Sequence, residues 1–375
     1  MRTLISFYTI YYHWVAGMFL FFSPIALVLT VLGYVVMFLL AATIAPKVAG
    51  KLSGTFSLYS SMVLTLVLII FVFSATLAAI IYAIQLWQGA PVNLTDPSVV
   101  WGFIVPIMAF VIIANLITYL ISPFMINMFY GARPDQRLQE IVNRVAQRLG
   151  VKPPKAVRVR GPPNAFAYGN IVTGKYVAVT DGMMELVDQN ELEAVIGHEI
   201  GHHKHRDNAI MLFLGILPSV IYYLGVSLVH LALWGGNAGR RNGSGNAIIA
   251  IVGIAAVIVS FVLQILILAF SRLREYYADL EGARAAGKSA MQAALAKIHI
   301  FYRRNEDIHQ SVKDSKMRAL FIYALTDAVA EPFYRVSRAD IERIMRSEYS
   351  PIEEILATHP PIPKRLRFLE NLTWI

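Results

Sequence analysis

Residues 198–202 read His-Glu-Ile-Gly-His, a pattern whose residue types and spacing suit hydrolysis at a metal ion. On a helix, His198 and His202 lie one turn apart on the same face, so both imidazoles can bind one tetrahedral Zn²⁺. Glu199, beside them, can take a proton from a water molecule that the metal activates. The pattern therefore predicts zinc bound by His198 and His202, with Glu199 as the general base.

A catalytic zinc site needs a third protein ligand. The position ten residues after His198 is Asn208, which excludes a third histidine at that spacing. The chain has no cysteine, so the ligand must be His, Glu or Asp. Glu275 is the best candidate, the alternative being a surface carboxylate paired with a neighbouring arginine. Asp279, one turn later, faces the same side and can accept the second ring N–H of a ligating histidine.

The other polar residues near the motif are given simpler interpretations. His203 and His205 lie off the face that the two ligands share, and we interpret them as solvated or membrane-interface residues. Asp207 either orients a neighbour or caps the turn before the next apolar run. His13 and His230 lie in apolar runs and are interpreted as interface residues rather than ligands.

The composition indicates a membrane protein. The chain is 57% hydrophobic with a mean hydropathy of +0.56, above the usual range of soluble domains. The charge-free runs are each long enough to span a bilayer. The expected spans are about 15–45, 58–87, 99–128, 209–234 and 247–270. The first run would also permit two short spans, and it is too long for a cleaved signal peptide.

The remaining charge lies mostly in 129–208 and 271–375, whose compositions suit folded, water-facing segments. Acidic residues interleave with the basic ones, so the net charge of +9 gives no nucleic-acid signal and suits an anionic lipid bilayer better. Lys47 and Lys51 place the 46–57 loop inside. Counting spans from there puts both segments on the cytoplasmic side of the cell membrane, although Arg240 and Arg241 argue against it.

The sequence predicts a mostly α-helical chain with a small β-sheet. Segment 155–181 has strand composition, and a helix begins at Asp188, where Glu191 completes a capping-box pattern. Other helices are expected over 134–149, 273–304 and 337–347. The predicted parts are a membrane region of three or four spans at 1–128, a first water-facing part at 129–208, a transmembrane hairpin at 209–270 and a second water-facing part at 271–375.

The positions of the membrane spans predict that Glu275 lies close to His198 and His202. His202 lies shortly before the fourth span and Glu275 shortly after the fifth, so both lie roughly 7–11 Å beyond the same membrane face at 1.5 Å per residue. Because a short connection joins these two spans, ligands from antiparallel neighbours can reach one ion.

Four motifs in this order resemble the HtpX-type integral-membrane zinc metallopeptidases, relatives of the CAAX prenyl endopeptidases. The motifs are Asn164-Ala-Phe-Ala-Tyr-Gly169, His198-Glu-Ile-Gly-His202, Arg274-Glu-Tyr-Tyr-Ala-Asp279 and Thr358-His-Pro-Pro-Ile-Pro-Lys-Arg365. The resemblance covers roughly Phe103 to Leu369. It implies a gluzincin-type α+β metalloprotease domain carried by a multi-pass helical membrane protein. It also implies one zinc ion bound by His198, His202 and Glu275.

The resemblance also implies how a substrate is held. Asn164 and Ala165 would lie on an edge segment that hydrogen-bonds a substrate backbone. His359 and Arg365 would contact the substrate, and His359 could stabilise the oxyanion. The chain departs from the family pattern in the extra hydrophobic segment 1–56 and in Tyr168, which stands where a small residue is more usual.

The expected function is that of a membrane-bound zinc endopeptidase. The resemblance suggests misfolded or damaged membrane proteins as substrates, and so a role in protein quality control. One alternative is an intramembrane site-two-type protease, which the charges around the metal motif disfavour. The other is a metal transporter or sensor, which the lack of ionisable residues in the spans disfavours. The sequence leaves the oligomeric state open.

Overall fold

The computed structural model describes residues 55–88, 99–234, 243–303, 336–349, 354, 357 and 359–372. These residues are mostly helical and include one four-stranded sheet, which confirms the predicted fold class. The membrane-region helices are α3 (Thr55–Gln88), η1 (Val100–Ile104), α5 (Val105–Phe129), α9 (Asp207–Trp234) and α10 (Gly243–Ala286). The other helices are α6 (Gln136–Arg148), α7 (Asp181–Leu186), α8 (Gln189–Lys204), α11 (Lys288–Tyr302), α13 (Arg338–Arg346) and α15 (Ile362–Glu370).

The four expected spans that fall within the described residues are all long apolar helices. The helices long and apolar enough to cross a membrane are Leu58–Gln88, Val100–Phe129, Asp207–Trp234 and Gly245–Ala286. The expected span at 15–45 lies outside the described residues. The last helix, α10, does not end with its apolar part near 270 but continues unbroken to Ala286. Glu275 is therefore carried on the extension of a membrane helix.

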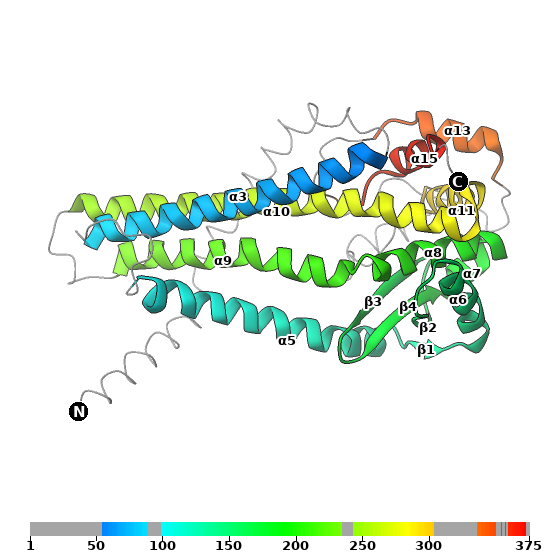
Figure 1. Ribbon diagram of the computed structural model, residues 1–375, viewed down its shortest axis with the longest axis horizontal. Coiled ribbons are helices and arrows are strands. Elements are labelled where there is room, and N and C mark those ends of the chain that lie inside the picture. Colours follow the sequence, from blue (N-terminus) through cyan, green and yellow to red (C-terminus); the bar gives the residue numbers. More distant parts are fainter. Residues whose placement is uncertain are drawn as a thin grey trace. The chain divides into compact units, whose positions relative to one another are not determined.

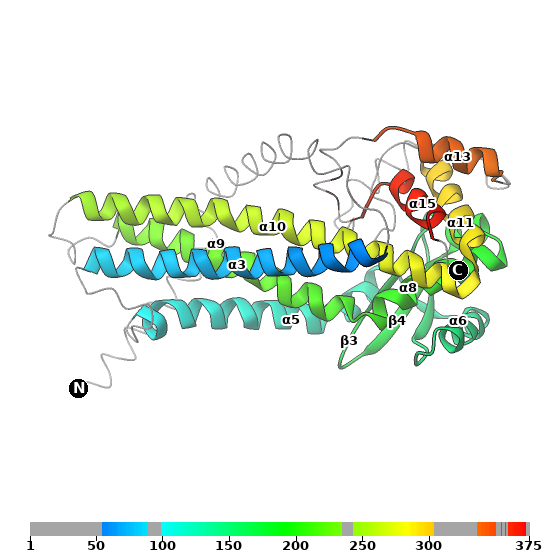
Figure 2. The same ribbon diagram turned by 45° about the horizontal axis from the view of Figure 1, so that its top comes forward.

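The chain divides into two compact units. The first contains Leu66–Ala114 and Leu214–Ile267, and in it α3, α5, α9 and α10 run along one another (Figures 1 and 2). Trp87 Nε1 donates to Asn246 Oδ1 at 3.0 Å, so a polar bond joins α3 to α10 within this unit. The second unit contains Asn115–Phe213 and the chain from Leu268 onward, together with Thr65 and the residues just before it. All candidate site residues belong to the second unit.

The sheet of the second unit has the order β1-β2-β4-β3. Its strands are β1 (Arg133–Pro134), β2 (Lys155–Val159), β3 (Ala165–Asn170) and β4 (Gly174–Thr180). β2 and β4 are parallel, whereas β1 pairs with β2 and β3 pairs with β4 in antiparallel fashion. Among the described strands, β3 pairs only with β4, so its other side is a free edge.

Alternation along the strands gives the sheet two buried faces. Ala165, Val177 and Val179 join the main core with α6, α8 and α11. Phe166 and Tyr168, on the opposite face, pack with residues that include Ile126 at the end of α5. The sheet is thus held between the main core and the last turns of a membrane helix.

Local signals position the helices that carry the site. Asp188 caps α8, and Glu191 completes the predicted capping box. The helix expected over 273–304 is two helices, because Gly287 has φ +94°, a conformation that L side chains rarely adopt. The chain therefore turns at Gly287, and α11 packs back against α8.

Helices α8 and α10 cross with almost no space between their backbones. A Cβ on Gly197 would lie 2.4 Å from the Cβ of Ala285, and a Cβ on Gly282 would lie 2.7 Å from the carbonyl oxygen of Ala194. Gly201 faces Ala278 at the same crossing, where an added Cβ would lie 3.2 Å from its Cα. Only glycine permits this approach, and His198 stands beside it.

We expect Gly282→Ala to destabilise the protein, because its methyl group must push α8 and α10 apart. Overpacking of this kind costs about 1–3 kcal/mol. Thermal unfolding in detergent measures the change. Gly215→Ala is the matched control, because an added Cβ at Gly215 meets nothing within 4 Å. That control should be neutral or gain up to about 1 kcal/mol from helix propensity. Equal unfolding temperatures for the two variants would contradict the crossing.

Candidate metal centre and active site

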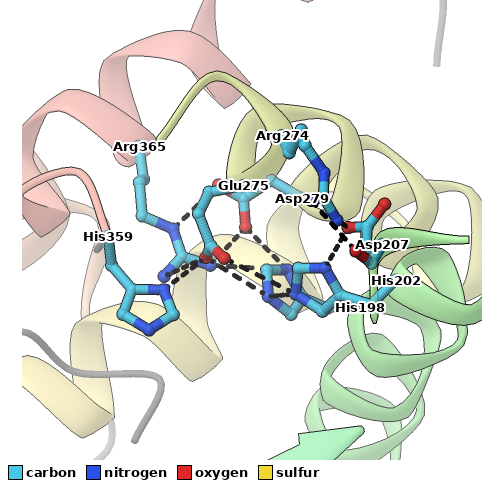
Figure 3. Close-up of polar contacts among 8 residues, drawn as sticks. All are labelled: His198, His202, Asp207, Arg274, Glu275, Asp279, His359 and Arg365. Carbon is cyan, nitrogen blue, oxygen red and sulfur yellow. Dashed lines mark hydrogen bonds and ion pairs between the residues drawn. The ribbon is translucent and has the colours of Figure 1, made fainter. Parts of the chain in front are cut away.

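Two helices supply the candidate ligands. His198 and His202 project from α8, and Glu275 projects from α10 toward both imidazoles (Figure 3). His198 Nε2 lies 3.2 Å from His202 Nε2. Glu275 carboxylate oxygens lie 3.6 Å from each of these nitrogens. The structure thus brings together the three residues that the sequence proposed as ligands.

These separations fit a tetrahedral ion. Zinc binds imidazole nitrogen and carboxylate oxygen at about 2.0–2.2 Å, so ligand atoms on a regular tetrahedron lie roughly 3.3–3.6 Å apart. The distance of 3.2 Å between the two nitrogens is close to this, and each nitrogen lies 3.6 Å from a different oxygen of Glu275, Oε2 for His198 and Oε1 for His202. The side chains of His198 and Glu275 are 2% and 5% exposed, so they lie in a site from which water is largely excluded.

The far nitrogen of each histidine faces a carboxylate. His198 Nδ1 lies 3.0 Å from Asp279 Oδ1, and Arg365 Nε donates to Asp279 Oδ2 at 2.9 Å. With Nδ1 facing Asp279, the Nε2 atom of His198 is directed toward the candidate metal position. Asp279 therefore lies beside the candidate ligand His198, which is the position that the sequence predicted for it.

His202 has an equivalent arrangement on the other side. Its Nδ1 lies 2.6 Å from Asp207 Oδ2, and Arg274 forms a buried ion pair with the same carboxylate. Asp207 reaches back to His202 because Arg206 adopts a left-handed φ of +58° between α8 and α9. Arg274 thus pairs with Asp207 and leaves Glu275 directed at the histidines.

The charge of the site suits a divalent cation. Four carboxylates (Glu199, Asp207, Glu275 and Asp279) and two guanidiniums (Arg274 and Arg365) are all buried. With the histidines neutral and the acids ionised, four negative and two positive charges leave a net charge of −2. A bound Zn²⁺ would neutralise this, and the donor set matches the ligands that zinc prefers.

Burial sets the protonation of the reactive groups in the metal-free chain. Desolvation raises the pKa of Glu199 to about 7, with Glu275 adding to the rise and His198 opposing it. Desolvation also lowers the pKa of His202 to about 4, so its imidazole is neutral at physiological pH. A neutral imidazole is the form that binds metal. Glu199 Oε1 has no hydrogen-bond partner among the described residues.

The free edge of β3 lies beside Glu199. The backbone N–H of Ala167 donates to the Glu199 carboxylate. The N–H of Asn164 donates to Thr180 Oγ1 at 2.8 Å, and its carbonyl accepts from Thr180 N at 3.0 Å. Since antiparallel pairs alternate, the backbone groups of Ala165 and Ala167 point away from β4. A substrate contact of Asn164 would thus come from its side chain. Ala167 is an edge residue that the sequence analysis did not name as a substrate-binding residue.

The two residues from the C-terminal motif lie at different depths. His359 Nδ1 lies 2.8 Å from Glu275 Oε2, and its side chain is 14% exposed. Arg365 is fully buried, and the buried carboxylates, led by Asp279, hold its pKa above the ordinary arginine value despite desolvation. The sequence resemblance gave Arg365 a substrate contact, whereas its guanidinium in the structure bonds to Asp279.

One interpretation of the neighbouring histidines is wrong. His203 is not solvated: it is 7% exposed and its Nε2 lies 2.8 Å from the carbonyl oxygen of Tyr176 on β4. The burial arises from a strand that is distant in sequence, so the pattern along α8 could not reveal it. His205 is partly buried and lies 3.5 Å from Glu281.

A comparison with protein families places these residues in a known group. The sequence profile described as Peptidase family M48 matches residues 132–373, which is more than half of the chain and includes every candidate site residue. The chain belongs to peptidase family M48. Membership makes it a protease, and the apolar helices make it a multi-pass membrane protein.

The M48 chain is similar along nearly its whole length to curated proteins named "Protease HtpX homolog". The protein from Pyrobaculum aerophilum is 59% identical over 357 residues, which cover 95% of this chain and 99% of that protein. The protein from Archaeoglobus fulgidus is 57% identical over 355 residues, with the same two coverages. The chain is therefore an HtpX-type M48 membrane protease, as the resemblance predicted.

A solved structure is also similar. The crystal structure of S. mikatae Ste24p matches with a TM-score of 0.46 and 19% identity, covering 84% of this M48 chain and 67% of that chain.

We expect Asp207→Asn to weaken zinc binding by about 10–100-fold, because His202 loses the carboxylate that orients its ring. Competition with a chromophoric chelator measures the affinity. Asp181→Asn is the control, because Asp181 pairs with the exposed Arg158 outside the site. Unchanged zinc affinity in a folded Asp207→Asn protein would show that this carboxylate does not support the metal.

Proposed function

We propose that this chain is a zinc-dependent endopeptidase that cleaves membrane proteins in water, close to the membrane surface. The observation that carries the proposal is the convergence of His198 Nε2, His202 Nε2 and the Glu275 carboxylate, whose separations leave room for one zinc ion among them. Glu199 and the free edge of β3 stand next to these atoms. One ligand atom from each of these three residues lies within 4.8 Å of the other two.

The proposed chemistry assigns each group one task. Bound zinc supplies a Lewis acid that polarises the scissile carbonyl and acidifies the attacking water. Glu199 takes the proton of that water and delivers it to the leaving amine.

Substrate binding is proposed to occur by strand addition. An extended peptide that pairs with Ala165 and Ala167 on β3 is held through its backbone, with little side-chain preference. His359, partly exposed and beside Glu275, is available to stabilise the developing oxyanion. Arg365 is better assigned to positioning, because it bonds to Asp279, which in turn lies against His198.

The biological setting is part of the proposal. Backbone recognition with weak sequence preference suits misfolded or damaged membrane proteins, and so a role in quality control. Lys47 and Lys51, which the sequence places between the apolar runs 15–45 and 58–87, favour a catalytic unit on the cytoplasmic side of the cell membrane.

The alternative functions fit less well. An intramembrane site-two-type protease carries its metal motif inside a span, whereas α8 is not among the four candidate spans of the described residues. A transporter needs ionisable groups along its spans. Among the described residues, the buried acidic and basic side chains of α9 and α10 are at Asp207 and from Arg274 onward, outside the apolar stretches of these helices.

We expect Glu199→Gln to keep its zinc but lose at least about 10²-fold in the rate of peptide cleavage, because the amide cannot accept the proton of the attacking water. Zinc content and cleavage of a membrane-protein substrate in detergent are measured on the same preparation. Glu185→Gln, at an exposed position on α7, is the control. Full activity of Glu199→Gln would remove Glu199 from the mechanism.

A second expectation separates an enzyme from a metal-binding scaffold. Treatment with a zinc chelator should abolish cleavage by the wild-type protein, and added Zn²⁺ should restore it. Cleavage that persists after measured removal of zinc would contradict a metal-dependent mechanism. Absence of cleavage by the zinc-loaded protein on every membrane-protein substrate would favour the scaffold.

A further inference from the structure

The turn between β3 and β4 exposes two large aliphatic side chains. Ile171 is 90% exposed and Val172 is 71% exposed. Turns in water are normally built from small or polar residues, so adjacent exposed aliphatic residues at a hairpin tip require a partner.

The hairpin tip is attached to α5 at a defined height. Pro123 has no backbone N–H, so the carbonyl of Tyr119, one turn earlier, loses its backbone donor; within α5 it accepts from Ser122 Oγ at 3.1 Å. Asn170 Nδ2 donates to this carbonyl at 2.9 Å and to the carbonyl of Leu120 at 3.0 Å. The side chain at the base of the turn thus fills a gap in the hydrogen bonding of a membrane helix.

The same asparagine satisfies the turn itself. Asn170 Oδ1 accepts from the backbone N–H groups of Val172 and Thr173, both at 2.9 Å, and from Thr173 Oγ1 at 3.1 Å. Backbone donors that face lipid must be paired within the protein, because hydrocarbon offers no partner. The donors of this turn already meet that requirement.

The attachment point lies where the bilayer boundary is expected. The candidate span Val100–Phe129 has 30 residues. A helix of that length extends about 45 Å, whereas the hydrocarbon core is about 30 Å thick. About 20 residues counted from Val100 end at Tyr119 and Leu120. One face of the later turns is covered by the sheet, since Ile126 is 7% exposed and Tyr168 donates its hydroxyl to Asn127, whereas Phe124 and Met128 are 59% and 64% exposed.

The residues behind the tip have an interfacial composition. Tyr168 and Tyr176 are paired across β3 and β4, and their rings stack with centroids 5.0 Å apart. Lys155 Nζ lies 5.0 Å from the centre of the Tyr176 ring. Tyrosine and lysine are enriched where protein meets the membrane–water interface. From Tyr168 on β3 to Ile171 in the turn, the composition therefore changes from interfacial to aliphatic.

We propose that Ile171 and Val172 enter the bilayer at the boundary between headgroups and acyl chains, beside α5. The β3–β4 hairpin is then a shallow lipid anchor, of the kind that buries an apolar edge about 5–10 Å into the interface. The occupant of the exposed tip is lipid, because the tip is bonded to a membrane-spanning helix at the expected height of the boundary.

A consequence follows if the proposed function also holds. One end of β3 meets the lipid at Asn170, while Ala167 contacts Glu199. A substrate segment that leaves the bilayer beside α5 would reach the free edge of β3 directly. The arrangement should favour chains that are still attached to the membrane over soluble peptides.

The absence of cysteine in the chain permits a direct test of depth. Ile171→Cys is labelled with an environment-sensitive fluorophore and reconstituted in phosphatidylcholine–phosphatidylglycerol vesicles. Quenching by lipids brominated on their acyl chains, together with protection from aqueous iodide, is the expected result. Glu185→Cys, exposed on α7, should show the reverse. Iodide quenching of the Ile171→Cys label equal to that of the control would overturn the proposal, as would a disulfide linking two copies through Ile171→Cys.

A second experiment tests the consequence. Ile171→Asp combined with Val172→Asp should cleave a soluble peptide at the wild-type rate but cleave a bilayer-anchored peptide severalfold more slowly. Equal loss on both substrates would reject the path from the bilayer. If the wild-type protein cleaves neither substrate, the proposed function fails, whereas the depth measurement still decides the lipid anchor.

Discussion

The close crossing of α8 and α10 is the constraint on which the site depends. Gly197 and Gly282 let the two backbones approach so closely that a single methyl group would collide with the opposite helix. His198 follows Gly197 directly, so the crossing fixes how far its imidazole stands from Glu275. Metal ligands tolerate little error in separation, because their reach is set by bond lengths rather than by packing. The glycines therefore set the separation of the candidate ligands, although none of them is itself a candidate ligand.

Charge explains why the site can be buried. Ionised groups leave water at a high cost unless they are paired, and removing one partner of a buried pair leaves the other uncompensated. Each histidine faces a carboxylate that is paired with an arginine, through Asp279 with Arg365 and through Asp207 with Arg274. The negative charge that remains is concentrated at Glu275 and Glu199, where a divalent cation would sit. The same pairs keep the imidazoles oriented.

The sequence predicted those parts of the site that follow from the spacing of residues within one helix or from the positions of the membrane spans. The ligand spacing of His198 and His202, the capping box at Asp188 and the shared face of Glu275 and Asp279 all follow from 3.6 residues per turn. Contacts between distant elements could not be predicted. The burial of His203 depends on β4, and the approach of Asp207 to His202 depends on the left-handed backbone of Arg206, which no local rule assigns to an arginine.

The bond between Asn170 and the carbonyl of Tyr119 ties together residues that are far apart in the chain. Pro123 removes the backbone donor of that carbonyl, and Asn170 supplies a replacement beside Ser122 Oγ while also closing its own turn. Without Asn170 the carbonyl would still accept from Ser122 Oγ, but the backbone N–H groups of Val172 and Thr173 would lose their acceptor. One side chain therefore couples the conformation of the β3–β4 turn to the irregular turn of α5, so a displacement of either element is passed to the other.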